Sequence, residues 1–251
     1  MKKVSLIITL FICCLSTAVL AQNNSFAQAN ELYGKGKYQE AAALYESILK
    51  TQGVAPELYY NLGNAYYKMN ETGLSILNYE RALRLSPRYE NAKVNLELAQ
   101  LRVVDNVKQI STFFVKRWIE VINKTLTSNQ WLFLSVSLFA LTIVFVLLFI
   151  FSYSQTIRRS SFYFALILFI ISMVSVTFSY VRKNQLDAHK EAIIMVGTVT
   201  AKSSPDKSGT ILFQLHEGTK VSIESYLGNW TEIKLGNGDI GWIENTNYEV
   251  I

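Results

Sequence analysis

Residues 131–151 read WLFLSVSLFALTIVFVLLFIF, and residues 162–181 read FYFALILFIISMVSVTFSYV. Neither run contains a charged residue, and each is close to the ~20 residues that a helix needs to cross ~30 Å of hydrocarbon. The segment between them, SYSQTIRRSS (152–161), is long enough for a turn but not for a domain. Because the core helices of soluble proteins rarely lack a polar face, the two runs predict a transmembrane hairpin. A hairpin returns the chain to the side of the membrane from which it came.

Residues 1–21 have the features of a secretory signal peptide. Lys2 and Lys3 precede an apolar segment from Val4 to Leu15, and small residues near Ala21 form a cleavage site. Both cysteines of the chain lie in this apolar segment. The cleaved chain would therefore contain no disulfide, no thiol nucleophile and no cysteine-based metal site.

Two arguments about orientation disagree. The short loop carries Arg158 and Arg159, as a cytoplasmic loop should, but the outer flanks carry more basic residues, which on a simple count favours the opposite orientation. The first segment usually sets the orientation, so we give the signal peptide more weight. We expect the loop in the cytoplasm and residues 22–130 and 182–251 on the far side of the membrane. The basic residues of the outer flanks are Lys116, Arg117, Lys124, Arg182, Lys183 and Lys190.

Residues 22–106 contain an internal repeat. Residues 22–55 and 56–89 superpose with a period of 34, and a 34-residue period with helix-sized halves is similar to tetratricopeptide repeats. Residues 90–106 continue the phase and predict a solvent-facing capping helix. The matching pairs include Asn30 and Asn64, Tyr33 and Tyr67, and Tyr45 and Tyr79. The motif positions of the second repeat are Tyr59, Leu62, Gly63, Tyr66, Ser75, Tyr79, Ala82 and Pro87.

Small residues are expected where the helices of each repeat cross, Gly63 with Ser75 and Ala29 with Ala41. Such an array presents a concave face made by the first helix of each pair. Side-chain amides on that face could hold an extended peptide backbone, or they could be ordinary solvated or locally bonded asparagines. Basic residues are too few there to predict recognition of a terminal carboxylate. The residues expected on the concave face are Asn30, Tyr33, Tyr60, Asn61, Asn64, Tyr67, Lys68 and Asn95.

Residues 107–130 join the repeats to the hairpin. Apolar residues recur there at helical spacing, and basic residues lie mostly on the other side, which predicts an amphipathic helix at the membrane interface. A helix that binds a protein partner is the alternative. No ionisable residue lies within either apolar run, so no ion pathway is indicated. The apolar positions are Ile110, Phe113, Phe114, Trp118, Val121 and Ile122.

Residues 182–251 change to the pattern of short strands separated by Gly, Asn and Asp turns, which predicts a small all-β barrel. Thr231, Ile233 and Leu235 should alternate to the inside, with Trp230 on the other face. The order of motifs resembles a bacterial SH3 domain. The residues that carry this resemblance are Ser204-Pro205, Leu215 to Val221, Trp230, Ile233, Gly238 and Gly241-Trp242.

The SH3 resemblance implies a barrel of five to seven strands that binds peptides or cell-wall material. We expect Trp242 in the core, whereas Trp230 could serve either the core or a ligand. His216 and His189 are the only histidines and have no neighbouring ligand candidates, so no metal site is expected. The groove residues would be Ser204, Tyr226, Asn229, Trp230 and Trp242.

The whole chain resembles the BatE family of the Bacteroides aerotolerance operon, most specifically in NAKVNLELA (91–99) and in VTAKSSPDKSGTILFQLHEGTKVSI (199–223) followed by GWIE (241–244). The resemblance implies a multidomain membrane protein of the Gram-negative inner membrane. Its parts would be a tetratricopeptide solenoid, a two-helix hairpin and an SH3-like barrel, with both soluble domains in the periplasm. It also implies partners among membrane proteins with von Willebrand type A domains, and a link to oxygen or stress tolerance.

These features favour a membrane-anchored scaffold that binds proteins through the repeats and the barrel. The alternative is a tether that grips peptidoglycan through the barrel. The sequence contains no recognisable catalytic carboxylate pair and no phosphate loop, so we expect neither an enzyme nor a cofactor. The formal net charge is +5, but the basic residues are scattered, so no nucleic-acid partner is expected.

Overall fold

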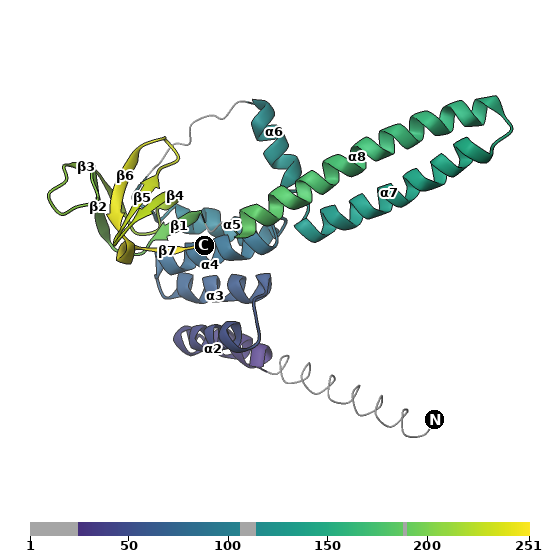
Figure 1. The fold of residues 1–251 in the computed structure, drawn as a ribbon. Helices are drawn as coiled ribbons and strands as arrows, with labels where there is room; N and C mark the ends of the chain where they lie inside the picture. Colours follow the sequence, from purple (N-terminus) through teal and green to yellow (C-terminus); the bar gives the residue numbers. More distant parts are fainter. Residues whose placement is uncertain (1–24, 106–113, 188–189) are drawn as a thin grey trace, which may run out of the picture. The chain divides into compact units, whose positions relative to one another are not determined.

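A computed structural model describes residues 25–105, 114–187 and 190–251 (Figure 1). The expected signal peptide lies outside the described residues, and so does the first part of the expected juxtamembrane segment. The chain divides into two compact units. One unit combines the N-terminal part, to residue 110, with the C-terminal part from residue 190, and the other comprises residues 111–189.

The N-terminal part of the first unit is a stack of helices in the expected repeat order, in which consecutive helices pack against each other. Residues 25–34 are helical, and the first repeat turns at Gly36, which takes φ +76°. Asn70, with φ +63°, makes the corresponding turn of the second repeat. Pro56 begins its helix at a position where a missing N–H costs nothing. The later helices are α2 (Tyr38–Thr51), α3 (Pro56–Lys68), α4 (Thr72–Leu85) and α5 (Glu90–Gln100).

Small residues allow α3 and α4 to pack closely, as expected from the sequence. A Cβ atom on Gly63 would lie 2.7 Å from Cε1 of Tyr79 and 3.3 Å from the carbonyl oxygen of Ser75. The hydroxyl of Ser75 donates to the carbonyl oxygen of Gly63 at 3.0 Å. Ala29 and Ala41, the equivalent pair of the first repeat, are fully buried.

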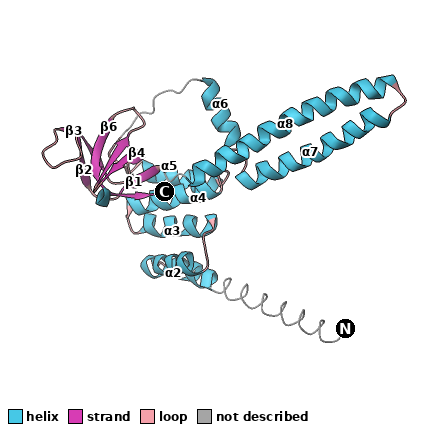
Figure 2. Ribbon diagram, viewed as in Figure 1, coloured by secondary structure: helices cyan, strands magenta, loops and turns pink. Residues whose placement is uncertain are grey.

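The C-terminal part of this unit is an antiparallel sheet, drawn in magenta in Figure 2. Its strand order is β3-β2-β6-β5-β4-β1-β7. Thr231, Ile233 and Leu235 are buried, and Trp230 lies on the other face, so the expected alternation is confirmed. The strands are β1 (Glu191–Ile194), β2 (Thr198–Lys202), β3 (Ile211–His216), β4 (Lys220–Leu227), β5 (Trp230–Lys234), β6 (Ile240–Glu244) and β7 (Tyr248–Val250).

The sheet and the repeats share a hydrophobic core. Ile76 and Leu77 of α4 cluster with Ile193 of β1 and with Ile251, and all four are at least 95% buried. The sequence suggested two independent modules, because a contact between distant segments leaves no local pattern. In the structure the array and the sheet belong to one compact unit.

The second unit contains α6 (Phe114–Asn123), α7 (Ser128–Phe151) and α8 (Gln155–Asp187). Helices α7 and α8 are long and apolar enough to cross a membrane, with only 11% and 22% of their apolar windows buried. Helix α8 begins before the expected span, so most of the expected loop 152–161 is helical. Helix α7 starts at a capping box in which Thr127 and Gln130 bond reciprocally.

Serines pair reciprocally along the contact between α7 and α8. Each hydroxyl of Ser135 and Ser172 donates to the other's carbonyl oxygen, at 3.1 and 3.0 Å. Ser128 and Ser179 repeat the arrangement seven residues away, at 3.0 and 2.9 Å. Small residues at a helix contact let two backbones approach closely within a bilayer.

Candidate functional site

Asparagine and tyrosine side chains form a repeated hydrogen-bond ladder along the first helices of the repeats. Asn30 Oδ1 accepts from the Tyr45 hydroxyl at 2.6 Å and from Asn61 Nδ2 at 2.9 Å. One repeat later, Asn64 Oδ1 accepts from the Tyr79 hydroxyl and from Asn95 Nδ2, both at 2.7 Å. The four asparagines of the expected concave face therefore lie together on one surface.

The ladder decides between the two expected roles only in part. The side-chain oxygens Oδ1 of Asn30 and Asn64 accept the hydrogen bonds of the ladder, so these amides are locally bonded. Their Nδ2 groups donate no hydrogen bond to any residue that the structure describes. Each amide thus retains donors for a ligand, while its orientation is fixed by its neighbours.

Three tyrosines of the expected concave face, Tyr33, Tyr60 and Tyr67, each contact another aromatic ring or a cation. Tyr60 lies 5.0 Å from Tyr89 between ring centroids, and Tyr33 lies 5.2 Å from Tyr38. The Arg102 guanidinium covers the ring of Tyr67, with its Cζ atom 3.6 Å from the ring centroid. Of the remaining expected concave-face residues, Lys68 is exposed.

Burial changes the chemistry of the tyrosines that anchor the ladder. Tyr45 is 1% exposed, and this burial raises the pKa of its hydroxyl to about 12. Burial also raises the pKa of Tyr79. Both hydroxyls donate to the side-chain oxygens of Asn30 and Asn64, and the raised pKa values keep them protonated well above neutral pH.

The sheet brings two of the five expected groove residues together. Trp242 pairs with Lys202 on β2 and with Glu232 on β5, and Trp230 pairs with Glu244, so both tryptophans lie on the outer face. Trp242 is half-buried, and the expectation that it belongs to the core is wrong. Its neighbour Ile243 takes the inward position instead, because successive side chains point to opposite faces.

The other three groove residues lie in connecting segments or near them. Ser204 is half-buried in the connection between β2 and β3. Tyr226 is 60% exposed near the end of β4, and Asn229 occupies the two-residue turn to β5, where its carbonyl oxygen accepts from the Asn245 N–H at 2.9 Å. Lys202 Nζ lies 5.6 Å from the Trp230 ring centroid, a contact that no sequence pattern indicates.

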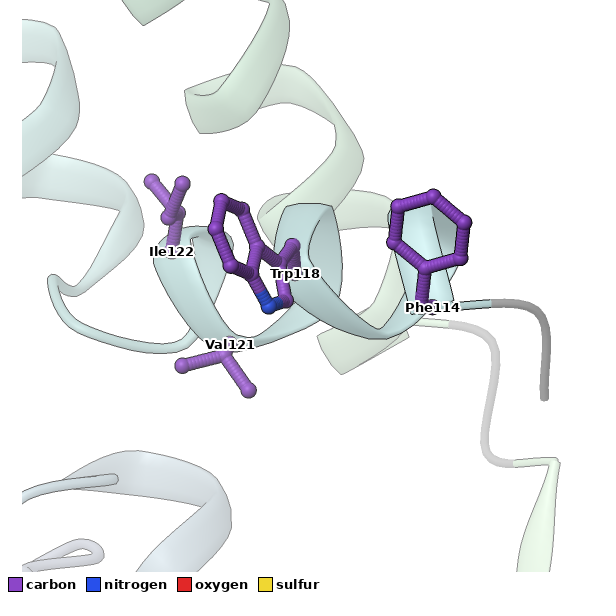
Figure 3. A pocket seen from close by; sticks show the side chains of 4 residues that line it. All are labelled: Phe114, Trp118, Val121 and Ile122. Carbon is purple, nitrogen blue, oxygen red and sulfur yellow. The ribbon is translucent and has the colours of Figure 1, made fainter. Parts of the chain in front are cut away.

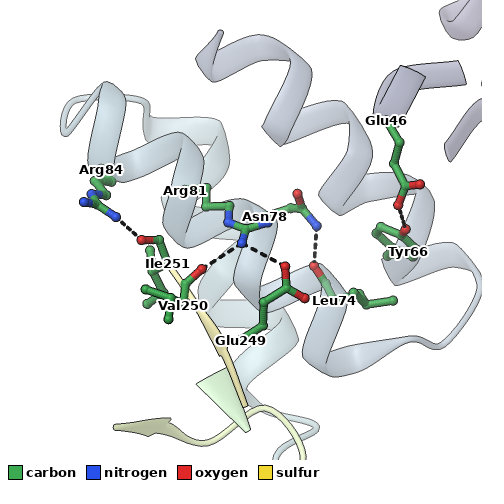
Figure 4. A network of polar contacts seen from close by, with 9 residues as sticks. All are labelled: Glu46, Tyr66, Leu74, Asn78, Arg81, Arg84, Glu249, Val250 and Ile251. Atoms are coloured by element: carbon green, nitrogen blue, oxygen red, sulfur yellow. Dashed lines mark hydrogen bonds and ion pairs between the residues drawn. The ribbon is translucent and has the colours of Figure 1, made fainter. Parts of the chain in front are cut away.

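Charged groups join the array to the sheet, as Figure 4 shows for the last strand. Arg81 of α4 donates to the Val250 carbonyl oxygen at 2.7 Å and pairs with Glu249 at 3.0 Å. Arg84 donates to the carbonyl oxygen of Ile251. These contacts were not expected from the sequence, because single arginines on a helix carry no signal for a distant partner.

Asp105 makes a second connection at the end of the repeat segment. Its carboxylate accepts from the His216 N–H at 2.7 Å and from the Thr219 hydroxyl at 2.6 Å, and it contacts the His216 ring nitrogen Nδ1 at 2.7 Å. Burial alone would raise the pKa of this carboxyl group. The hydrogen bonds from Thr219 and His216 outweigh it, so the pKa of Asp105 is lowered.

Asp105→Asn should loosen the turn between β3 and β4 at neutral pH by about 1–2 kcal/mol, since charge-assisted hydrogen bonds are lost. A carboxyl group whose pKa is lowered in the folded protein contributes its full stabilisation at any pH well above 3.8, its ordinary pKa. That contribution disappears as the pH falls through the lowered pKa of the folded protein.

Amide hydrogen exchange at His216 measures the free energy of opening this turn. The difference between the variant and the original protein should vanish in acid, and Asp239→Asn, in an exposed turn, should show no such difference.

Within the described residues, no group of three or more His, Cys, Asp or Glu side chains is arranged to hold a metal ion. The repeated hydrogen bonds of the asparagine ladder make the surface that carries it the candidate site, with the outer face of the sheet as a second candidate.

Residues 26–90 match the family model described as "Tetratricopeptide repeat". The chain is also 30% identical over 82 residues to "Tetratricopeptide repeat protein 16" of Homo sapiens, and to the protein of the same name from Macaca fascicularis. These matches cover 33% of this chain and only 9% of the length of either relative. The predicted tetratricopeptide repeats are confirmed, and they indicate a scaffold for protein–protein interaction.

Proposed function

We propose that this protein is a membrane-anchored periplasmic scaffold that binds an extended segment of a partner on the concave face of its tetratricopeptide repeats. The observation that carries the proposal is the asparagine ladder. It repeats with the period of the array, and it holds each amide in one orientation with donors left over. A row of fixed amides suits the regularly spaced carbonyl groups of an extended backbone.

The membrane anchor is supported by the exposed apolar surface of α7 and α8. Within the apolar windows of these helices most residues are unburied, which would be costly in water. Helix α6 adds exposed apolar side chains that line one shallow pocket, as Figure 3 shows. Trp118 is 71% exposed and Phe114 is 64% exposed. Residues of this kind suit the boundary between headgroups and acyl chains.

Membrane proteins with von Willebrand type A domains, in a stress-related complex of the inner membrane, are the proposed partners. This rests on the family resemblance of the sequence. Because the repeats and the sheet form one compact unit, a bound partner would meet a single preformed surface rather than two tethered modules.

A double variant, Asn30→Asp with Asn64→Asp, tests this function. Each substitution keeps the Oδ1 acceptor of the ladder and removes the Nδ2 donors. A new carboxylate would also repel a peptide carbonyl group. With about 1 kcal/mol lost at each position, recovery of crosslinked von Willebrand type A proteins should fall at least about tenfold. The measurement is in-cell crosslinking of the full chain, mild detergent extraction and quantitative mass spectrometry.

Gln39→Glu is the matched control, because it makes the same amide-to-acid change at an exposed position of α2. Equal recovery of the partner with the original protein, the double variant and the Gln39→Glu control would contradict the proposed site.

The alternative function, a peptidoglycan tether, is favoured by the two tryptophans on the outer face of the sheet. Aromatic side chains with a nearby cation can pack against a sugar or a peptide crossbridge. Sedimentation of the full chain with purified sacculi, lost on Trp242→Ala, would favour this alternative over the scaffold.

A further inference from the structure

The concave face continues onto α5 with a different chemistry. Asn95 lies 34 residues after Asn61 and makes the same contact, with its Nδ2 2.7 Å from Asn64 Oδ1. The equivalent distance in the preceding repeat is 2.9 Å, from Asn61 to Asn30. Helix α5 therefore preserves the rotational phase of α3, and residues 34 apart occupy equivalent places on the face.

This equivalence identifies two positions on α5 and a third at Leu101, the residue that caps its C-terminal end. Val94, Leu98 and Leu101 follow Tyr60, Asn64 and Tyr67 by one period. Their side chains are 52%, 48% and 82% exposed. The amide and aromatic groups of α3 are thus replaced on α5 by three aliphatic side chains, spaced four and three residues apart, which places them on one side of a helix.

These residues do not form the core of the array. The buried side of α5 consists of Ala92, Leu96 and Ala99, so the helix is apolar on two sides. A solvent-facing cap, as expected from the sequence, should instead be polar on its outer side. An exposed aliphatic stripe that continues a binding face is typical of a site for an apolar ligand group.

We infer that the concave face binds its ligand through two kinds of contact. The asparagines of the repeats bind the backbone of an extended segment. The Val94–Leu98–Leu101 stripe binds bulky apolar side chains at one end of that segment. The inference rests on the proposed function and specifies its ligand. Amide recognition ends at α3, because Leu98 stands where another asparagine would continue the row. In an extended segment alternate side chains point to the same side, so two apolar residues separated by one residue reach the stripe together.

The test uses two peptides that carry fluorescein at the N-terminus, fluorescein-GSGSLSL-amide and fluorescein-GSGSSSS-amide, and the full chain in mild detergent micelles. Fluorescence anisotropy should detect tighter binding of the leucine peptide. Leu98→Asn combined with Leu101→Asn should weaken that binding about tenfold, since apolar burial is lost, and leave the serine peptide unchanged. Because both residues are exposed, the thermal midpoint of the protein should not move.

Val54→Asn is the matched control, because Val54 is 60% exposed in the segment between α2 and α3. It should bind both peptides like the original protein. Equal binding of the two peptides, an unaffected double variant, or a lowered thermal midpoint would overturn the inference. If the peptide test fails but partner recovery still depends on Asn30 and Asn64, the proposed scaffold function is retained and only the inference about apolar side chains is rejected. Association of the leucine peptide with α5 as a helix, seen by circular dichroism, would also overturn it.

Discussion

Gly63→Ala should destabilise the second tetratricopeptide repeat by about 2 kcal/mol, although the substitution adds only one methyl group. That methyl would lie 2.7 Å from the ring of Tyr79, a side chain that is 1% exposed. The ring cannot move away easily, because its hydroxyl donates to Asn64 at 2.7 Å. Overpacking of this kind costs about 3 kcal/mol, well above the ~1 kcal/mol that alanine gains over glycine within a helix.

Amide hydrogen exchange across residues 56–85 measures this effect without requiring the whole chain to unfold in one step. Gly34→Ala is the matched control. Nothing lies within 4 Å of a Cβ atom at Gly34, so this variant should exchange as slowly as the original protein, or more slowly. If the two glycine variants lose the same protection, close packing at Gly63 does not hold the repeat together.

The contrast between these glycines explains how much of the fold could be predicted. Gly63 belongs to a repeated motif, and its place in the period predicts a close helix crossing from the sequence alone. Thr231, Ile233 and Leu235 similarly specified the inner face of a strand through simple alternation. Features with a short, regular period were therefore predictable, because the period itself reports which face is buried.

The candidate site was predictable to a smaller extent. The four asparagines were identified from their 34-residue spacing, but the hydrogen bonds that Asn30 and Asn64 accept from Tyr45 and Tyr79 were not. The sequence identified the two tyrosines only as equivalent positions of the repeat. Asp105 was missed entirely, since a single carboxylate gives no sign that it will bond His216, over a hundred residues later. Long-range polar contacts have no period, and only the folded chain defines them.

The reciprocal serine pairs between α7 and α8, here called the serine seam, were predictable to an intermediate extent. Ser128 and Ser135 are separated by seven residues, as are Ser172 and Ser179, so a heptad pattern is present in the sequence. Within an unbroken apolar run, however, other serines obscure it. Ser137, for example, is exposed, and its one hydrogen bond within the described part of the chain is to its own helix, at the Phe133 carbonyl oxygen. The structure distinguishes a serine of the seam from a serine on the outside.

Ser172→Leu should separate α7 from α8 by breaking this seam. The hydroxyl pair of Ser135 and Ser172 is buried, at 3% and 2% exposure, so there is no room for a leucine side chain. Overpacking contributes about 1–3 kcal/mol, and each lost interhelical hydrogen bond adds about 0.6 kcal/mol. The free energy of helix association should therefore fall by about 2–4 kcal/mol, whereas Ser172→Ala, which removes only the hydroxyl, should lower it by less than about 1.5 kcal/mol.

Energy transfer between labels on cysteines introduced at Asn129 and Lys183, both exposed, can follow the separation as dodecyl sulfate is added to the protein in bicelles. Ser137→Leu is the matched control, because the same change on the outside of α7 adds apolar surface toward lipid and should leave the dodecyl sulfate midpoint of helix separation unchanged.

An equal shift of this midpoint in the Ser137 and Ser172 leucine variants would mean that apolar content, not the seam, sets the strength of the hairpin. A shift confined to Ser172 would mean that the reciprocal serine pairs hold α7 and α8 together. In that case the two helices meet through a specific contact that lipid alone does not provide, since acyl chains are as apolar as the side chains they surround.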